Sequence, residues 1–296
     1  MKYALYLGCA TPVRALKYEI STRNVAKRLG IELVDLPEFS CCGFPVKSMD
    51  QSAALLMAAR NLALAEERGL DIIGLCTGCM AVLAEARVQL KDEKLRDRVN
   101  EKLRTLGVPE YRQGVSVKHF ARFLNEDYGL DALKEEIGVP LKSLKFGIHC
   151  GCHYAKPGHA HDYFDDPSNP ASLDKLIQGA GAETIEYPEK NLCCGLTIRG
   201  AAEDVSTKLA AEKLEALTNR GVDAMVVACP SCCIAYENNQ QLIGKKVGRE
   251  FNLPVLYFTQ VLGSALGLKE EDLGFEFNRI KFHPTSSPVL SVTENP

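Results

Sequence analysis

Twelve cysteines are the residues of this 296-residue chain whose number and spacing point to chemistry. They fall at Cys9, Cys41, Cys42, Cys76, Cys79, Cys150, Cys152, Cys193, Cys194, Cys229, Cys232 and Cys233. A Cys-Cys-Gly sequence occurs twice, and each time 33 or 34 residues lie between its second cysteine and a Cys-x-x-Cys pair. In a reducing compartment, thiols in such numbers are expected to serve as metal ligands or redox groups and not as disulfides.

The cysteines belong to an internal repeat. The Cys-Cys-Gly sequences begin at Cys41 and Cys193, 152 residues apart, and the Cys-x-x-Cys pairs begin at Cys76 and Cys229, 153 residues apart. The surrounding sequence repeats as well, because IELVDLPEFSCCGFP corresponds to AETIEYPEKNLCCGLT and GLDIIGLCTGCMAVLAEA corresponds to GVDAMVVACPSCCIAYEN. The chain therefore contains two copies of one unit.

Each copy has the same predicted order of strands and helices. Strands are predicted at residues 3–7, 32–36, 72–75, 146–149, 183–187 and 224–228. Helices are predicted at residues 12–29, 51–68, 173–179 and 202–220, and each Cys-x-x-Cys pair begins a further helix. Thr11 is the expected N-cap of the first helix, Pro12 suits its first position, and Gly30 is its expected end. This alternation predicts an α/β protein with two duplicated, pseudo-symmetric lobes and mostly parallel sheets.

The boundary between the lobes is expected near residue 143. We assign residues 1–143 to the first lobe, with the charged segment 88–143 as an inter-lobe segment, and residues 144–296 to the second. The tail from His283 is rich in Pro and Ser and is expected to be irregular. No apolar run approaches 18 residues, and the N-terminus resembles a strand more than a signal peptide, so we expect a cytoplasmic protein without a transmembrane helix. The net charge of −3 offers no basic excess for binding nucleic acid.

The expected positions of the cysteines favour metal binding. They lie at strand ends and helix starts, where α/β proteins gather ligand-binding residues and where the helix dipole stabilises a thiolate. Zinc takes four ligands in a tetrahedron, so five cysteines in each copy, two of them adjacent, exceed one zinc site. Iron–sulfur clusters accept thiolates over a larger surface. Two iron–sulfur clusters are the favoured interpretation, with two zinc sites or metal-free thiol redox chemistry as alternatives.

The complete pattern resembles a known family. In each copy a first cysteine is followed by 31 or 40 residues, Cys-Cys-Gly, a further 32 or 33 residues and Cys-x-x-Cys. This order is similar to the motif of the cysteine-rich CCG domain. Two complete copies without a ferredoxin-type Cys-x-x-Cys-x-x-Cys run resemble the family of heterodisulfide reductase subunits, designated B, from methanogenic archaea. The resemblance extends from Cys9 to Cys233. It implies a noncubane [4Fe-4S] cluster in each copy and, between them, reductive cleavage of the coenzyme M–coenzyme B disulfide in methanogenesis.

By position, the resemblance assigns five ligands to each cluster. The first thiol set is Cys9, Cys41, Cys42, Cys76 and Cys79, and the second thiol set is Cys152, Cys193, Cys194, Cys229 and Cys232. Cys152 is preferred to Cys150 because a Cys-His step, here Cys152-His153, opens the second half of such motifs. Cys150 and Cys233 are left over and are expected to be small buried side chains beside the site.

The implied substrate is anionic, since coenzyme M carries a sulfonate and coenzyme B a phosphate and a carboxylate. Cationic side chains should therefore bind it. Lys47 and Arg199 each lie five residues after the second cysteine of a pair, at equivalent points of the repeat, and Arg14 and Lys156 follow the first cysteines. For each of them the alternative is a solvated surface charge. His153 is a candidate proton donor or a hydrogen-bonding group beside a ligand. His119, His159, His161 and His283 lack a motif and are expected to be structural or on the surface.

Electrons are expected to come from other chains. No Gly-x-Gly-x-x-Gly follows a strand, so no flavin or nicotinamide site is predicted. The resemblance implies a ferredoxin-like iron–sulfur subunit, a flavin-containing subunit and an associated hydrogenase or formate dehydrogenase. Related chains occur in lactate-utilisation complexes, glycolate oxidase and thiol-dependent fumarate reductase. The alternative function is therefore an electron-relay subunit whose clusters never touch a substrate.

Overall fold

Two parallel four-stranded sheets organise the chain, of which a computed structural model describes residues 1–282. The first sheet contains β1 (Lys2–Tyr6), β2 (Glu32–Asp35), β3 (Ile72–Gly74) and β4 (Val117–His119) in the order β2-β1-β3-β4. The second contains β5 (Lys145–His149), β6 (Glu183–Ile185), β7 (Ala224–Val227) and β8 (Val255–Tyr257) in the order β6-β5-β7-β8. All neighbouring strands are parallel, which confirms the predicted α/β class with two duplicated lobes. The predicted irregular tail from His283 lies outside the described residues.

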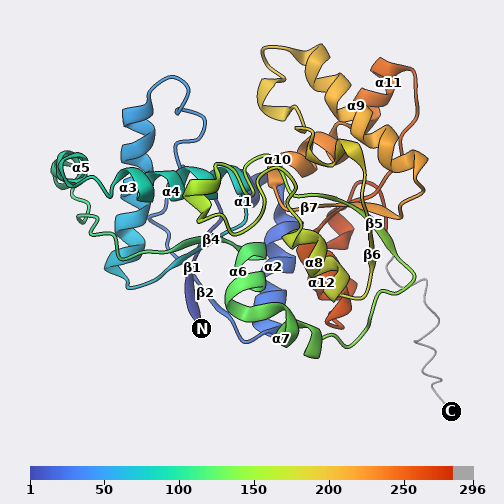
Figure 1. The fold of residues 1–296 in the computed structure, drawn as a ribbon, viewed down its shortest axis with the longest axis horizontal. Helices are drawn as coiled ribbons and strands as arrows, with labels where there is room; N and C mark the ends of the chain where they lie inside the picture. Colours follow the sequence, from blue (N-terminus) through green and yellow to red (C-terminus); the bar gives the residue numbers. More distant parts are fainter. Residues whose placement is uncertain (283–296) are drawn as a thin grey trace.

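Helices pack around both sheets (Figure 1). In the first lobe they are α1 (Thr11–Arg14), α2 (Leu16–Arg28), α3 (Gln51–Glu67), α4 (Thr77–Gln89), α5 (Glu93–Thr105), α6 (Phe120–Phe123) and α7 (Leu130–Glu135). In the second lobe they are α8 (Ser172–Gly179), α9 (Glu203–Asn219), α10 (Pro230–Cys233), α11 (Gln240–Val247) and α12 (Phe258–Ala265). Two π-helical turns, η1 (Leu124–Gly129) and η5 (Ile234–Asn238), continue α6 and α10. Within residues 1–282, no helix has the length and apolar character needed to cross a membrane.

The 3-10 turns are η2 (Gly158–His161), η3 (Pro188–Asn191), η4 (Leu196–Ile198), η6 (Glu270–Leu273) and η7 (Phe275–Phe277).

The helix predicted at residues 12–29 is interrupted. Its chain leaves helical geometry at Ala15, with φ −138° and ψ 39°, which separates α1 from α2. The predicted N-cap Thr11 is wrong, because Thr11 is already the first residue of α1 and Ala10 precedes it. The predicted end is confirmed, since Gly30 has φ +69°, a conformation that glycine adopts without steric cost.

Each sheet contains an edge strand that the sequence did not predict. β4 pairs with β3, with Val117 opposite Ile72, and β8 pairs with β7, with Val255 opposite Met225. Segment 88–143, expected only to connect the lobes, therefore also completes the first sheet. Both edge strands have three residues, too few to establish a pattern of alternation in the sequence.

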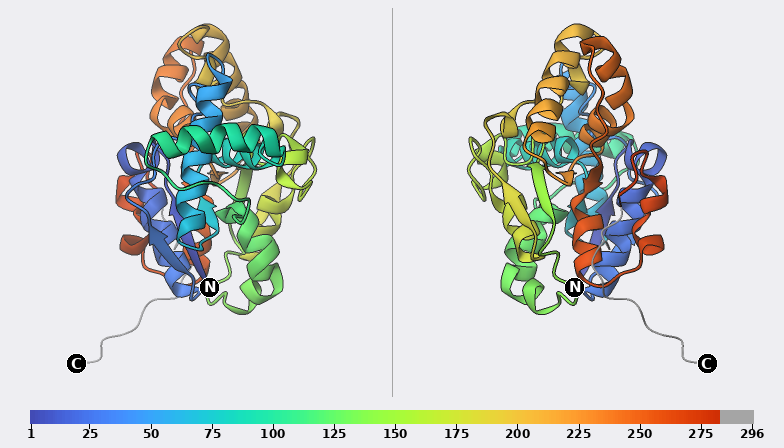
Figure 2. Two further views of the ribbon diagram at one scale, coloured as in Figure 1. Left: turned by 90° about the vertical axis from the view of Figure 1, so that its left-hand side faces the viewer. Right: turned by 90° about the vertical axis from the view of Figure 1, so that its right-hand side faces the viewer.

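The two lobes share a core built largely on α2 and α12. These helices lie side by side in both views of Figure 2, although one is near the N-terminus and the other near the C-terminus. Tyr18 of α2 stacks on Tyr257 of β8 with ring centroids 4.0 Å apart. Lys17 Nζ lies 2.5 Å from Glu237 Oε2, and both side chains are almost fully buried. One buried hydrophobic cluster therefore contains residues of both lobes, whereas a second cluster under α3, α4 and α5 belongs to the first lobe alone.

Candidate metal centres

The fold brings the cysteines to the carboxyl ends of the central strands. Cys9 follows β1 and Cys76 follows β3, while Cys152 follows β5 and Cys229 follows β7. In parallel sheets these ends form the usual ligand-binding edge. Both Cys-x-x-Cys pairs begin helices as predicted, because Cys76 is the N-cap of α4 and Cys229 is the N-cap of α10.

A glycine shapes the turn after each adjacent Cys-Cys pair. Gly43 has φ +92° and Gly195 has φ +74°, which disfavours any side chain at either position. A Cβ atom on Gly43 would lie 2.9 Å from Ala54 Cα of α3. A Cβ atom on Gly195 would lie 2.9 Å from Ser206 Cα, the matching contact with α9. The two glycines thus allow the paired cysteines to turn sharply against the following helix, as the repeat predicts.

The thiols of the first set lie close together. The Sγ atoms of Cys42 and Cys79 are 3.3 Å apart, and their hydrogen bond lowers the pKa of Cys42 to about 7. Burial raises the pKa of Cys41, and the neighbouring charges of Cys42 and Cys9 raise it further. The Gly43 N–H donates to Cys41 Sγ over 3.5 Å. A cavity of about 390 Å³ opens beside Cys9 and Cys41.

The second set has the same arrangement. Hydrogen bonds with Cys152 and Cys194 lower the pKa of Cys193 well below its ordinary value. Hydrogen bonds with Cys232 and then Cys76 likewise lower the pKa of Cys229. The Gly195 N–H donates to Cys193 Sγ over 3.3 Å, which matches the contact of Gly43 in the first lobe.

The two sets meet at the junction of the lobes. A Cβ atom on Gly151 would lie 3.1 Å from Thr77 Oγ1 of the first lobe and 3.5 Å from Cys229 Cβ of the second, so the residues that begin α4 and α10 approach each other. Interaction with Cys229 raises the pKa of Cys76. His153 of the second lobe lies edge-on against Phe44 of the first, with ring centroids 5.2 Å apart. Burial lowers the pKa of His153. The ten predicted ligands therefore form two neighbouring groups.

The leftover cysteines have different surroundings. Cys150 is buried, and burial raises its pKa to about 12, whereas Cys152 hydrogen-bonds with Cys193. Burial also raises the pKa of Cys233 to about 12, and its Sγ lies 3.5 Å from Glu237 Oε2, beside the buried ion pair of the lobe junction. His119 is structural, since its Nε2 lies 2.9 Å from Ala228 O.

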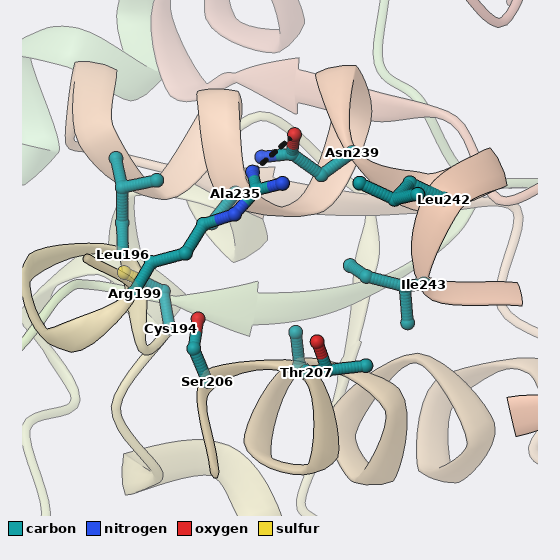
Figure 3. A pocket seen from close by; sticks show the side chains of 10 residues that line it. Cys194, Leu196, Arg199, Ser206, Thr207, Ala235, Asn239, Leu242 and Ile243 are labelled. Carbon is teal, nitrogen blue, oxygen red and sulfur yellow. Dashed lines mark hydrogen bonds between the residues drawn. The ribbon is translucent and has the colours of Figure 1, made fainter. Parts of the chain in front are cut away.

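The predicted anion-binding residues are dispersed. Lys47 forms an ion pair with Glu85, and the charges of both act on His153 at the junction. Arg199 donates from Nη1 to Asn239 Oδ1 over 2.6 Å, in the small pocket beside Cys194 that Figure 3 shows. Arg14 and Lys156 are exposed. The structure thus brings Lys47 near His153 and Arg199 near Cys194, but it does not gather the four cations at one point.

Two residues beside the second thiol set were not predicted from the sequence. Lys213 of α9 is completely buried, and His149, the last residue of β5, has its Nε2 3.2 Å from Cys232 Sγ. Lys213 lies on the apolar stripe of α9 with Ala210, Leu214 and Leu217. A lysine on such a stripe was the available signal, because lysines are almost never fully buried without a partner.

The donor set fits iron–sulfur clusters. All twelve cysteines have free thiols, and ten of them belong to the two sets, in each of which a glycine N–H donates to a cysteine Sγ. Thiolates are the usual protein ligands of such clusters. Among residues 1–282, no three His, Cys, Asp or Glu side chains are arranged around a single-ion site.

The fold and the thiol sets define a duplicated α/β protein with a cysteine centre in each half. The chain belongs to the CCG cysteine-rich domain family, whose model matches residues 3–84 and 146–235. It is 35% identical to the subunit designated B of the ferredoxin:CoB-CoM heterodisulfide reductase of Methanosarcina mazei, over 95% of this chain and 94% of the relative.

Two further similarities place the chain more broadly. It is 29% identical to the 8-methylmenaquinol:fumarate reductase membrane anchor subunit of Wolinella succinogenes, over 94% of this chain and 97% of that protein. A crystal structure of a hypothetical protein from Helicobacter pylori has a TM-score of 0.77 at 19% identity, covering 95% of this chain and 52% of that one. The structural likeness establishes the fold alone.

Proposed function

We propose that this chain is the catalytic subunit of a heterodisulfide reductase, which reduces the coenzyme M–coenzyme B disulfide to two thiols at two noncubane [4Fe-4S] clusters. The approach of the Cys76 end of α4 to Cys229 of the second lobe carries the proposal, because one proposed thiol set of each lobe then borders the same junction. Breaking the S–S bond consumes two electrons and two protons. When bound, two clusters supply single electrons, so a pair of adjacent sites matches the two-electron reaction. The 35% identity to a heterodisulfide reductase subunit supports the choice of substrate.

His153 is proposed to provide a hydrogen bond at the junction. It is half-buried between Phe44 and the thiols, and burial lowers its pKa, so that the imidazole is neutral near pH 7. A neutral imidazole both donates and accepts, which suits the relay of a proton to a departing thiolate.

The electron donors are proposed to be separate chains. A ferredoxin-like iron–sulfur subunit would pass electrons from a flavin-containing subunit, served by a hydrogenase or a formate dehydrogenase. The name of the Methanosarcina mazei relative includes ferredoxin, which supports an iron–sulfur partner. Purification from the native source should therefore bring iron–sulfur and flavin chains along with this one.

The direct test of the function is anaerobic addition of the coenzyme M–coenzyme B disulfide to the reduced, iron-loaded chain. We expect a change in the visible spectrum and the release of two thiols per disulfide, measured with a thiol reagent. Oxidised glutathione, a disulfide of different shape, serves as the control substrate. An unchanged spectrum and no thiol release would instead favour an electron-relay subunit.

Lys47→Ala and Arg199→Ala are expected to weaken substrate binding. If each side chain binds an anionic end of the disulfide, its loss removes a charge-assisted hydrogen bond of about 1.5–3 kcal/mol. The KM should rise roughly tenfold to hundredfold, since about 1.4 kcal/mol corresponds to a factor of ten. Iron content should not change, because neither residue is a proposed ligand. A normal KM in both variants would show that Lys47 and Arg199 do not bind the substrate and would leave Arg14, Lys156 and His153 as the candidate anion-binding residues.

A further inference from the structure

The buried Lys213 has three acceptors for its three N–H groups. Its Nζ lies 2.7 Å from Leu192 O, 2.8 Å from Lys190 O and 2.7 Å from His149 Nδ1. An ammonium group has three donors and no acceptor, so this environment fits the charged form.

The contact with Lys213 determines which nitrogen of His149 carries the proton. Because Lys213 donates to Nδ1, the hydrogen of the neutral ring must lie on Nε2. That nitrogen is 3.2 Å from Cys232 Sγ, so the N–H points to a cysteine of the second thiol set. The result is a directed chain of hydrogen bonds from a buried positive charge to a sulfur. Both donors are completely enclosed, at 0% exposure for Lys213 and 1% for His149.

The first lobe has different residues at the equivalent positions. Tyr6 ends β1 as His149 ends β5, and its hydroxyl donates to Ser40 O over 2.5 Å. Asn61 lies in α3 where Lys213 lies in α9, 152 residues later. Its amide donates to Cys41 O over 3.3 Å and accepts from the Ser40 N–H over 2.9 Å. Both first-lobe side chains are neutral and bond the backbone of the cysteine turn.

We propose that Lys213 and His149 are positioning residues that make the two centres electrostatically unequal, with the second cluster more easily reduced than the first. Positive charge and hydrogen bonds to ligand sulfurs raise the reduction potential of an iron–sulfur cluster. The inference rests on the proposed cofactors but not on the proposed substrate, since it concerns only the surroundings of the two thiol sets.

The test is a redox titration of the iron-loaded chain followed by electron paramagnetic resonance. Lys213→Met, which removes the charge and keeps the length, should make reduction of one centre at least tenfold less favourable, a drop of about 59 mV for one electron. The signal that disappears in Cys194→Ala identifies that centre as the second. His149→Gln removes the imidazole between Lys213 and Cys232 and should lower the potential of the same centre. This variant replaces Lys213→Met if Lys213→Met does not load iron.

Lys2→Met is the control, because Lys2 begins β1 at the end opposite the cysteines and its ion pair with Glu32 is exposed. Its loss should leave both potentials unchanged. Unchanged potentials in Lys213→Met and His149→Gln, or equal shifts of both centres, would overturn the proposal. The iron content of the unaltered chain is measured first. A chain without iron would contradict the proposed clusters themselves and not the role of Lys213. Inactivity toward the disulfide leaves the potentials measurable and would contradict only the substrate.

Discussion

Cys42→Ala and Cys194→Ala are each expected to lose about half of the iron of the chain. The unaltered protein, loaded anaerobically, should contain about eight irons and eight sulfides, from two four-iron clusters. Cys42 lies 3.3 Å from Cys79 inside the first set, and Cys194 hydrogen-bonds with Cys193 and Cys232 inside the second. Either substitution removes a ligand from one centre only. Elemental analysis for iron, sulfide and zinc measures the result directly.

Cys150→Ala and Cys233→Ala are the matched controls for these substitutions. Both thiols are buried but are not proposed ligands, so iron content should stay at about eight per chain. Stoichiometric zinc with little iron in the unaltered protein would contradict the cluster assignment and support zinc sites. Loss of all iron in Cys42→Ala alone would show that the second centre cannot assemble without the first.

Lys17→Met is expected to destabilise the protein by about 3–5 kcal/mol, since removal of one partner leaves Glu237 charged and buried. Glu237 also accepts the Arg279 N–H over 3.0 Å, but no second cation compensates it among the contacts that the structure describes for it. The ion pair connects α2 to η5, so its loss weakens the junction between the lobes. A shift of the denaturant midpoint at constant slope measures the change.

The exposed pair of Lys2 and Glu32 provides the comparison. Their side chains are 55% and 62% exposed, so Lys2→Met should change the free energy of unfolding by about 0–1 kcal/mol. In the double variant Lys17→Met/Glu237→Gln, removing the unpaired charge should recover part of the lost stability. Equal effects of Lys17→Met and Lys2→Met would show that the buried ion pair does not stabilise the junction.

The sequence repeat made much of the fold predictable. Local residue preferences, which occur in both copies, predict three features. These are the strands that precede cysteines, the helices that begin at Cys76 and Cys229, and the turns at Gly43 and Gly195. Because parallel strands collect their carboxyl ends at one edge, grouping of the cysteines followed from the order of the elements. Two independent copies of each signal reduced the ambiguity that short apolar segments normally carry.

Features that depend on tertiary packing were not predictable in this way. β4 and β8 are strands because a neighbouring strand is available to pair with, and their three residues carry little preference of their own. The acceptors of the Lys213 ammonium group could not be predicted from the sequence, since two of them are backbone carbonyls of a distant turn. The approach of Cys76 to Cys229 depends on how the lobes dock, which no periodicity within either copy determines.

The packing of α2 on α12 has a consequence for biosynthesis. Residues 29–257 separate the two helices, so when α2 leaves the ribosome its helix partner has not yet been made. The stack of Tyr18 on Tyr257 and the ion pair of Lys17 with Glu237 cannot form until the later partner of each has been synthesised. Domains commonly fold in order from the N-terminus during synthesis, but here the first lobe cannot bury its own second helix alone. Completion of the junction, and with it the contact between the two thiol sets, therefore becomes a late event that follows translation of β8 and α12.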